Sequence, residues 1–365
     1  MSVRNLKVKN FINKLNIQLP IIQAPMAGTT PPPLIAVVSN AGGLGSFGAG
    51  YLPAKKIREG IKAIRDLTDK PFAVNLFVPQ FPDIKKNEDK IKKMNLQLNS
   101  YREQLGLPQP SLAKYQEDFM EQISVIIEEK VPIFSFTFGI PSAEVIAQLK
   151  HNNILLMGTA TTVQEAIEIE KSGCDVIIAQ GSEAGGHRGT FLKEFSRSQI
   201  GTMALIPQIV DKATLPVAAS GGIMDGRGLI AALTLGASGI QMGTAFLTCS
   251  ESGIHELYKQ AILDSTEEST VITKIFSGKP ARGISNQFIE ELENSFANNN
   301  LPDYPIQNSL TQDIRKAAAA QNKISFMSMW SGQGTRLSRK MSAKDLIQEI
   351  QKEANDTLKI LCSEK

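Results

Sequence analysis

The sequence predicts an α/β protein, a (β/α)8 TIM barrel with a helical insertion after its third strand and a smaller second lobe after its eighth. Eight short apolar runs rich in Val, Ile and Phe have the pattern of strands that are buried on both faces of a parallel sheet. Helical patterns separate these runs, and this repeated alternation favours a sheet closed into a barrel. An open doubly wound sheet is the alternative, but eight consecutive units suit closure better.

The expected strands are spread over the first 250 residues of the chain. They are IIQAP from Ile21, LGSFG from Leu44, PFAVNLF from Pro71, VPIFSFTFG from Val131, ILLMGTA from Ile154, CDVIIAQ from Cys174, LPVAASG from Leu215 and SGIQMGTAF from Ser238. Each run is short and apolar, as expected of a strand in the middle of a parallel sheet.

Helices are expected between these strands. Segment 31–43 begins with three prolines and ends with two glycines, which is the usual asymmetry of a helix. Segment 53–69 carries Ile57, Ile61 and Ile64 at helical spacing. The remaining expected helices have Gly or Asn near their ends, and they are 141–153, 161–173 and 225–237.

Three stretches do not follow the repeat. Residues 80–120 are polar and helix-prone, which predicts an insertion on a barrel that spans residues 1–247. Residues 248–324 have helical and irregular patterns and are expected to form a smaller α-rich lobe over the barrel mouth. Residues 325–365 combine a glycine-rich turn with an amphipathic helix and are expected to return to the barrel.

Composition excludes several classes of function. The hydrophobic content of 42% and charged content of 21% are typical of a globular protein, and a net charge of +3 does not predict nucleic-acid binding. Three widely spaced cysteines suggest neither a disulfide framework nor a metal site. Neither a signal peptide nor an apolar run approaching the roughly 20 residues of a membrane span is visible. We therefore expect a cytoplasmic protein without a membrane, metal or nucleic-acid partner.

Candidate binding residues cluster where the expected strands end, because the functional loops of such barrels follow the strands. The set is Ala24, Pro25 and Met26 after the first strand, Asn75 in the third, Gln180 at the end of the sixth, Gly221 and Gly222 after the seventh, and Gln241, Met242, Gly243 and Thr244 after the eighth. The amides of Asn75 and Gln180 can pair with the polar edge of a heterocycle.

The turns after strands seven and eight predict a phosphate site. Their glycines allow an anion to approach the backbone, and helix N-termini add positive dipole ends. The alternative is that these glycines only form tight turns. The stretch 42–50 contains a formal GxGxxG match, but it does not open a helix directly after a strand, so a mononucleotide is the simpler ligand.

His187 is the candidate catalytic residue. It stands in the glycine-rich stretch AQGSEAGGHRGTF after strand six, and an imidazole can donate or accept a proton near neutral pH. Glu183 would either orient it or cap the loop. The alternative for a lone histidine is a structural role, which we expect for His151 and His255.

Five motifs in this order resemble the nitronate monooxygenase family, formerly called 2-nitropropane dioxygenases. The motifs are IIQAPMAG, SNAGGLGSFGAG, AQGSEAGGHRG, GGIMDGRGLIAALTLGASGIQMGTAF and SGKPARGISN, and the similarity runs from residue 20 to about residue 335. The resemblance implies a barrel with non-covalently bound FMN. It also implies oxidation of alkyl nitronates by O2 to a carbonyl compound and nitrite.

The resemblance also implies roles for individual residues. His187 matches the family's active-site histidine, and the segment WSGQG from Trp330 looks like the one that returns to the flavin pocket. From its position beside His187, and not from the resemblance, Arg188 is either a group that recognises a substrate carboxylate or a solvated arginine. The residues that look like flavin contacts are Pro25, Met26, Asn75, Gln180, Gly185, Gly222, Gln241, Met242, Gly243 and Thr244.

Two other functions remain open at this stage. Flavin-dependent enoyl-acyl-carrier-protein reductases share the barrel and a loop similar to 183–187, and some relatives are quinone reductases; both use NAD(P)H. A flavin-binding sensor or storage protein would be expected to lack a catalytic donor, whereas His187 is present. The sequence leaves open the physiological substrate, the use of NAD(P)H, a homodimer and the role of the 80–120 insertion.

Overall fold

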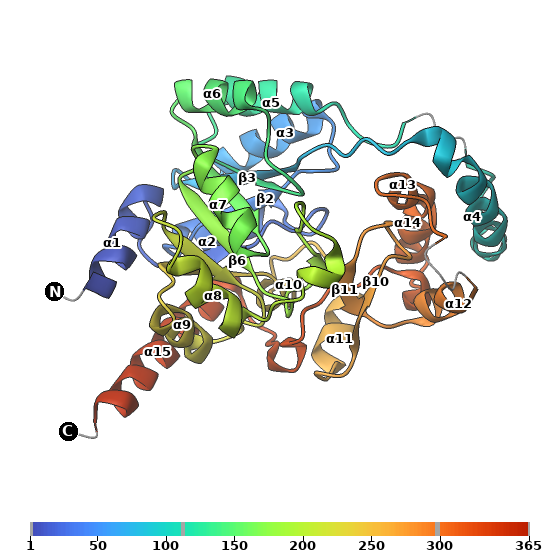
Figure 1. Ribbon diagram of the computed structural model, residues 1–365. Coiled ribbons are helices and arrows are strands. Elements are labelled where there is room, and N and C mark those ends of the chain that lie inside the picture. Colours follow the sequence, from blue (N-terminus) through green and yellow to red (C-terminus); the bar gives the residue numbers. More distant parts are fainter. Residues whose placement is uncertain (1–2, 111–113, 296–299, 364–365) are drawn as a thin grey trace.

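The computed structural model describes residues 3–110, 114–295 and 300–363, and its centre is a parallel barrel (Figure 1). Eight strands run in the order β1-β9-β8-β6-β5-β4-β3-β2, and a parallel bridge from Ile22 to Leu44 joins the first and last of them. The strands are β1 (Ile21–Gln23), β2 (Gly45–Gly48), β3 (Phe72–Phe77), β4 (Ile133–Thr137), β5 (Leu155–Ala160), β6 (Val176–Gln180), β8 (Val217–Ser220) and β9 (Gly239–Met242). The predicted (β/α)8 barrel is confirmed.

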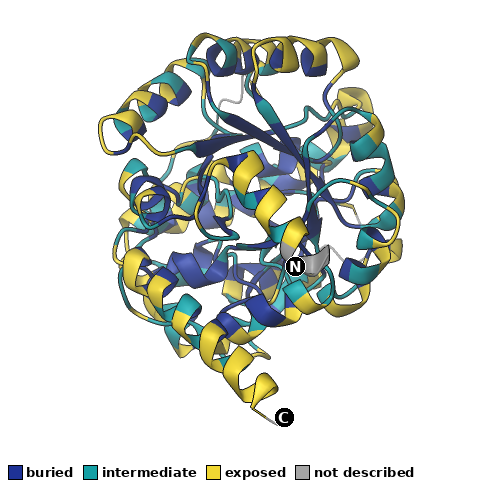
Figure 2. Ribbon diagram, turned by 90° about the vertical axis from the view of Figure 1, so that its left-hand side faces the viewer, coloured by how far each residue is buried: buried dark blue, intermediate teal, exposed yellow. Residues whose placement is uncertain are grey.

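Helices surround the barrel and bury their apolar faces against it, as the dark-blue inner faces in Figure 2 show. In α3, the residues Ile57, Ile61 and Ile64 at helical spacing are all fully buried. The surrounding helices are α2 (Pro32–Asn40), α3 (Ala54–Arg65), α5 (Phe119–Glu128), α6 (Ala143–His151), α7 (Val163–Lys171), α8 (Thr202–Val210), α9 (Gly226–Thr234) and the short α10 (Thr244–Leu247).

The two ends of the barrel differ. At the amino-terminal ends of the strands, α1 (Val3–Leu15) inserts Phe11 and Leu15 among the inward-facing residues of the strands and closes that end. The carboxyl ends of the strands stay open toward the rest of the chain. A ligand can therefore enter this barrel only from the carboxyl ends of its strands.

Residues after α10 form a second lobe beside the barrel mouth. It contains α11 (Glu256–Asp264), β10 (Thr270–Thr273), β11 (Ala281–Ile284), α12 (Gln287–Ser295), α13 (Ile306–Leu310), α14 (Gln312–Ala320) and the single turn Ile324–Phe326. Strands β10 and β11 pair with β7 (Gly186–His187) in a three-stranded sheet, which the helical and irregular pattern of this region did not predict.

The insertion packs against the second lobe. Its long helix α4 (Ile84–Leu105) lies beside α12, α13 and α14 in Figure 1. Met94, Leu98 and Tyr101 share one core with residues of the lobe, and buried Arg102 contacts Asp313 of α14 at 2.8 Å. The insertion therefore contributes to the core of the second lobe.

The last part of the chain returns to the barrel at two places. Trp330 forms an antiparallel bridge with Gly283 of β11, near the barrel mouth. The helix α15 (Ala343–Cys362) packs on α9 and α2. Two further single helical turns lie at Phe195–Arg197, between β7 and α8, and at Thr335–Leu337, shortly before α15.

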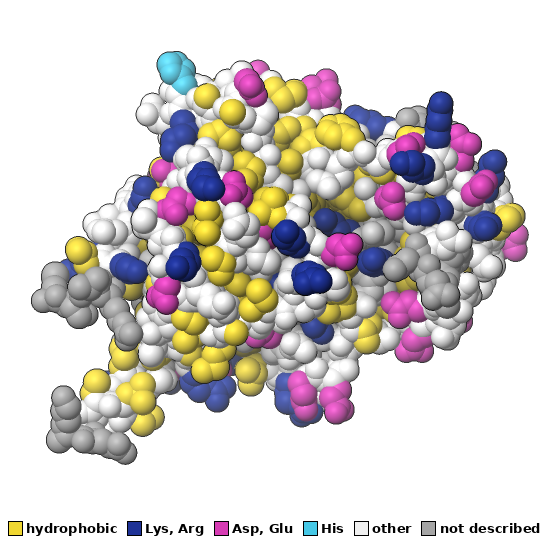
Figure 3. Space-filling model, viewed as in Figure 1, with side chains coloured by type: hydrophobic (Ala, Val, Ile, Leu, Met, Phe, Trp, Pro, Cys, Tyr) yellow, Lys and Arg dark blue, Asp and Glu magenta, His cyan; other side chains and the backbone are white. Residues whose placement is uncertain are grey.

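One face of the molecule carries charged side chains of both signs. On the face shown in Figure 3, acidic and basic side chains are interspersed. None of the helices in the described part of the chain is long and apolar enough to cross a membrane.

Candidate active site

A cavity of about 1200 Å³, its open mouth included, lies at the carboxyl ends of the strands. Its walls come from the ends of the barrel strands, from Tyr258 of the second lobe and from Trp330 of the returning segment. The residues predicted from sequence that line it are Ala24, Pro25, Met26, Asn75, Gln180, Gly185, His187, Gly221, Gly222, Gln241, Gly243 and Thr244. Twelve positions scattered between residues 24 and 244 are thus brought together.

Met242 is the exception among the predicted residues. Its side chain is 1% exposed and belongs to the core between the strands and the surrounding helices. Successive side chains of a strand point to opposite faces, so Gln241 lines the cavity and Met242 cannot. The Met242 side chain therefore does not line the cavity, and a flavin contact of Met242 stays a prediction for its main chain.

The turn after β8 presents a row of main-chain donors. Within the described residues, the NH groups of Gly221, Gly222, Ile223 and Met224 have no backbone or side-chain acceptor. All four residues line the cavity, and φ angles of +115° and +71° at Gly221 and Gly222 create the conformation of the turn. Unpaired NH groups at the edge of a core are costly unless an acceptor binds them, so this turn suits an anion.

The turn after β9 offers a second group of donors. The NH groups of Gly243 and Thr244 also have no acceptor in the described part of the chain. A Cβ atom added at Gly243 would lie 3.6 Å from the Cβ of Ala24 and 3.7 Å from the sulfur of Met26. The cavity therefore reaches the bare backbone of this turn, between β9 and the loop after β1.

The N-terminus of α9 does not contribute to this group of donors. The NH of Gly226 donates to the Glu353 carboxylate at 2.9 Å, and the NH of Gly228 donates to Asp225 at 3.2 Å. The expectation that this helix N-terminus supplies a positive end for a phosphate is therefore wrong, because two carboxylates of the chain already occupy it.

His187 lies in an ordered strand on one side of the cavity. Its main chain pairs with Ala281 of β11, and its Nε2 lies 2.8 Å from the hydroxyl oxygen of Ser277. The Ser277 hydroxyl also donates to the carbonyl of Lys279 at 3.0 Å. Burial, followed by the nearby charges of Lys279 and Arg315, lowers the pKa of His187 to about 3, so the imidazole is neutral at physiological pH.

Aromatic side chains surround the imidazole. The ring centroids of Phe138, Tyr304 and Trp330 lie 5.7, 6.0 and 5.4 Å from that of His187. The hydroxyl of Tyr258 donates to the carbonyl of Trp330 at 2.5 Å and holds the returning segment against the second lobe. These rings keep water from much of the imidazole and explain why its charged form is disfavoured.

The two charged neighbours of His187 in the sequence have structural roles. Glu183 accepts hydrogen bonds from the NH and the hydroxyl of Thr202 at 2.9 and 2.8 Å, so it caps α8 and does not orient the histidine. Arg188 is 6% exposed and donates to the carbonyls of Gln180, Thr161 and Ser198. Both predictions for Arg188 are therefore wrong, since it is neither solvated nor directed at a substrate.

The two predicted amide side chains differ in whether they keep a hydrogen-bonding atom for a ligand. Gln180 uses both of its amide atoms locally, because it donates to the carbonyl of His187 at 3.1 Å and accepts from the NH of Gly189 at 2.8 Å. Asn75 donates to Ser135 at 3.0 Å, and no described residue donates to its side-chain oxygen. Asn75 thus keeps an acceptor for a ligand, whereas Gln180 shapes the turn that carries His187.

Sequence reasoning missed several residues of the site. Ser277 and Lys279 stand in the motif SGKPARGISN but were not singled out, and the lysine nitrogen lies 4.7 Å from the ring centroid of Phe138. Tyr51, Phe77 and Phe138 follow or end barrel strands and line the cavity, so the rule that located Asn75 could also have found them. Tyr304 and Arg315 lie in the second lobe, and no local pattern marked them.

Comparison with known proteins is consistent with this geometry. The family model described as nitronate monooxygenase matches residues 9–353. The chain belongs to the nitronate monooxygenase family. A "Probable nitronate monooxygenase" from Staphylococcus saprophyticus is 50% identical over 347 residues, covering 94% of this chain and 97% of the relative. One from Staphylococcus haemolyticus is 49% identical over 350 residues, with 95% and 97% covered.

Solved structures show the same relationship. A nitroalkane oxidase from Streptomyces ansochromogenes has a TM-score of 0.89 and 36% identity, covering 96% of this chain and 99% of that chain. FabK from Thermotoga maritima has a TM-score of 0.76 and 30% identity, covering 96% and 97%. The predicted nitronate monooxygenase family and the assignment of the chain as an oxidoreductase enzyme are confirmed.

Proposed function

We propose that this member of the nitronate monooxygenase family uses FMN to oxidise alkyl nitronates with O2, giving a carbonyl compound and nitrite. One observation carries the proposal. The same cavity is lined by the turns after β8 and β9, whose NH groups have no acceptor among the described residues, and by the neutral imidazole of His187. The nitroalkane oxidase similarity supports the same class of substrate.

The residues present fit FMN. The NH groups of Gly221 to Met224 and of Gly243 and Thr244 would hold its phosphate, with glycine backbone allowing close approach. Pro25 and Met26 would line the ring, and Asn75 offers an acceptor at the cavity wall. When bound, the flavin supplies the redox chemistry, which takes electrons from the substrate and passes them to O2.

The protein's own residues bind the anionic substrate and place a proton donor or acceptor beside it. A nitronate is already an anion, so its oxidation needs no strong base. Lys279 and Arg315 place positive charge near His187, which favours an anion beside the imidazole. The aromatic rings of Phe138, Tyr304 and Trp330 limit water around that position.

The orientation of the Ser277 hydroxyl determines which nitrogen of the His187 imidazole carries the proton. When this hydroxyl donates to the Lys279 carbonyl, Nε2 of His187 must donate to it, and Nδ1 then carries a lone pair. In that state Nδ1 can accept a hydrogen bond from a substrate, while its pKa of about 3 makes it a weak base for the α-proton of a neutral nitroalkane. When the hydroxyl turns and donates to Nε2, Nδ1 carries the proton and can donate a hydrogen bond to a nitronate oxygen.

The similarity to FabK favours a second candidate, an FMN-dependent reductase driven by NAD(P)H and related to enoyl-acyl-carrier-protein or quinone reductases. Anaerobic mixing of the FMN-loaded protein separates the two. We expect ethyl nitronate to bleach the flavin absorbance and later admission of O2 to release nitrite, while NADH has little effect. Bleaching by NADH but not by the nitronate would overturn the proposal in favour of the reductase.

A further inference from the structure

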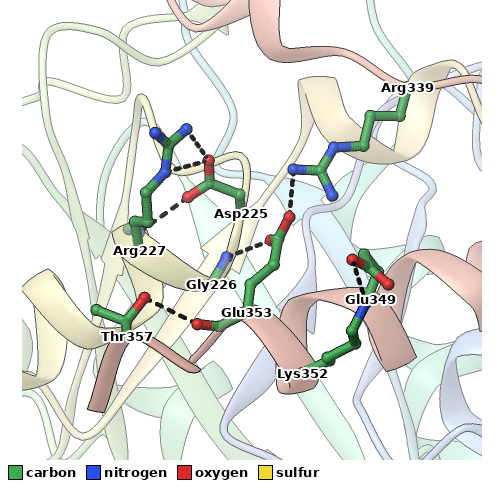
Figure 4. Close-up of polar contacts among 9 residues, drawn as sticks. Asp225, Gly226, Arg227, Arg339, Glu349, Lys352, Glu353 and Thr357 are labelled. Atoms are coloured by element: carbon green, nitrogen blue, oxygen red, sulfur yellow. Dashed lines mark hydrogen bonds and ion pairs between the residues drawn. The ribbon is translucent and has the colours of Figure 1, made fainter. Parts of the chain in front are cut away.

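The row of free donors after β8 ends at a contact with the C-terminal helix. From Gly221 to Asp225 the main-chain NH groups have no acceptor in the described residues, and the next NH, that of Gly226, donates to Oε2 of Glu353 at 2.9 Å. Figure 4 shows Glu353 pointing from α15 toward the first residue of α9. The turn is therefore anchored at one end by strand β8 and at the other by a residue more than a hundred positions later.

The Glu353 carboxylate is held in place from its other side. Its Oε1 lies 2.6 Å from the Arg339 guanidinium, and both side chains are about one-quarter exposed, at 25% and 27%. Figure 4 shows Arg339 on the side of the carboxylate away from Gly226. An anion at a helix N-terminus is stabilised by the helix dipole, and the guanidinium reduces the cost of bringing that anion out of bulk water.

The adjacent residue of the turn reinforces the same arrangement. Asp225 accepts from the NH of Gly228 at 3.2 Å and pairs with the side chain of Arg227. Burial alone would raise the pKa of Asp225, but its hydrogen bonds with Arg227 and Gly228 lower the pKa below the ordinary value. Two carboxylates thus fix the start of α9.

The two helices approach so closely that only glycine fits at their contact. A Cβ atom added at Gly226 would lie 2.3 Å from the main-chain nitrogen of Ala354 and 2.6 Å from the carbonyl oxygen of Ile350. Leu346, Ile347 and Ile350 of α15 are buried in the core beneath this contact. A shift of α15 is therefore transmitted directly to the residue that ends the donor turn.

We propose that Glu353 is a positioning residue for cofactor binding, which holds the 221–225 turn through the NH of Gly226 so that its free NH groups face the phosphate. The inference rests on the proposed function. Within the described residues the main-chain NH groups of the turn make no hydrogen bonds, so its shape depends on its ends, on the Thr202 hydroxyl that donates to the Gly221 carbonyl at 3.0 Å, and on the burial of Ile223 and Met224. Coupling of this kind is reciprocal: if docking of α15 favours FMN binding, then FMN binding must favour docking of α15.

Titration of the apoprotein with FMN, in which quenching of the flavin fluorescence reports binding, tests the role of Glu353. Glu353→Ala is expected to raise the Kd about tenfold, the effect of losing roughly one charged hydrogen bond. Glu353→Gln keeps an oxygen that accepts from Gly226 and is expected to stay within about threefold of the wild type. Glu349→Ala is the matched control, because Glu349 lies on the same helix and its partner among the described residues is the exposed Lys352, at 3.4 Å.

A merely structural role predicts a different result. In that case Glu353→Ala would lower thermal stability but leave the Kd of FMN unchanged, as Glu349→Ala does, and the inference would be overturned. If the wild type itself bound no FMN, the proposed function would fail instead. The two failures are thus separate.

Hydrogen exchange of the wild type gives a test that needs no variant. Addition of FMN is expected to slow exchange several-fold in the amides of α15 around residue 353, because binding favours the docked helix. Unchanged exchange in α15, together with clear protection of residues 221–225, would contradict the coupling. This measurement decides the matter even if Glu353→Ala does not fold.

Discussion

Nε2 of His187 lies 2.8 Å from the hydroxyl oxygen of Ser277, across 90 positions of sequence. The contact joins the strand that follows the barrel's β6 to a turn of the second lobe. Ser277 is the one hydrogen-bonding partner that the described residues offer to the imidazole ring. The lobe therefore controls which nitrogen of the histidine carries the proton, and so whether Nδ1 offers a substrate a lone pair or a proton.

Removing this hydroxyl should impair turnover without affecting the cofactor. We expect Ser277→Ala to lower kcat for ethyl nitronate about fivefold, since one hydrogen bond of about 1 kcal/mol orients the ring. Steady-state O2 consumption and an FMN titration measure the two effects. Ser285→Ala, which removes an exposed hydroxyl of the same lobe bonded to Glu290, should change neither, and equal losses in both variants would refute the role of Ser277.

Removal of the imidazole should have a larger effect. We expect His187→Ala to retain FMN, with a Kd within about threefold of the wild type, and to lose turnover by a factor of about 10² to 10⁴, the usual contribution of a positioned acid or base. Nitrite release and O2 uptake give the rates, and flavin absorbance gives the occupancy. A variant that kept the wild-type kcat would remove His187 from the chemistry.

The glycine turn can be tested separately from the histidine. At Gly222, φ is +71° and an added Cβ would lie 3.3 Å from the Cβ of Glu183, so Gly222→Ala should distort the donor turn. We expect the Kd of FMN to rise about tenfold or more.

Gly106→Ala is the control for this backbone effect. Gly106 ends α4 at φ +66° with no atom within 4 Å of an added Cβ, so the substitution carries the same conformational cost far from the cavity. It should lower the free energy of unfolding by about 1 kcal/mol and leave the Kd of FMN unchanged. Equal FMN affinities in the two variants would contradict the placement of the phosphate.

The depressed pKa of His187 predicts a pH dependence of stability. In the folded protein the pKa is about 3, against an ordinary 6.5, so below pH 6.5 the unfolded chain takes up a proton that the native state does not. This contribution to stability is complete above pH 6.5 and is lost progressively as the pH falls toward 3.

Chemical denaturation at several pH values measures this effect. Between pH 7 and pH 4, the wild type should lose on the order of 2 kcal/mol of unfolding free energy relative to His187→Gln. His151→Gln, at the exposed end of α6, controls for the loss of a histidine as such. Parallel pH profiles of the wild type and His187→Gln would show that burial does not hold the imidazole neutral.

Local patterns were sufficient to predict the barrel and much of its mouth. Apolar runs located the eight strands, and the ends of those strands located Asn75, Gly222 and Gly243 because parallel strands bring their carboxyl ends to one edge. Alternation along β9 also predicts that the Met242 side chain points away from that of Gln241, in agreement with its burial in the core.

Other features depend on contacts between distant segments. Ser277, Lys279 and Arg315 reach His187 only because the second lobe packs beside the barrel mouth, and nothing in their own sequence marks that contact. The contact between the insertion and the second lobe could not be predicted for the same reason. The sequence of an amphipathic helix such as α4 shows which of its faces is buried, but not which segment covers that face. Glu353 likewise lies on a C-terminal helix whose sequence shows no link to α9.

A crystal structure of the protein grown with FMN tests the central claim most directly. The account predicts phosphate oxygens within hydrogen-bonding distance of the main-chain nitrogens of Gly222 and Thr244, and the flavin ring beside the imidazole of His187. A phosphate bound elsewhere, or a flavin ring remote from that imidazole, would contradict it.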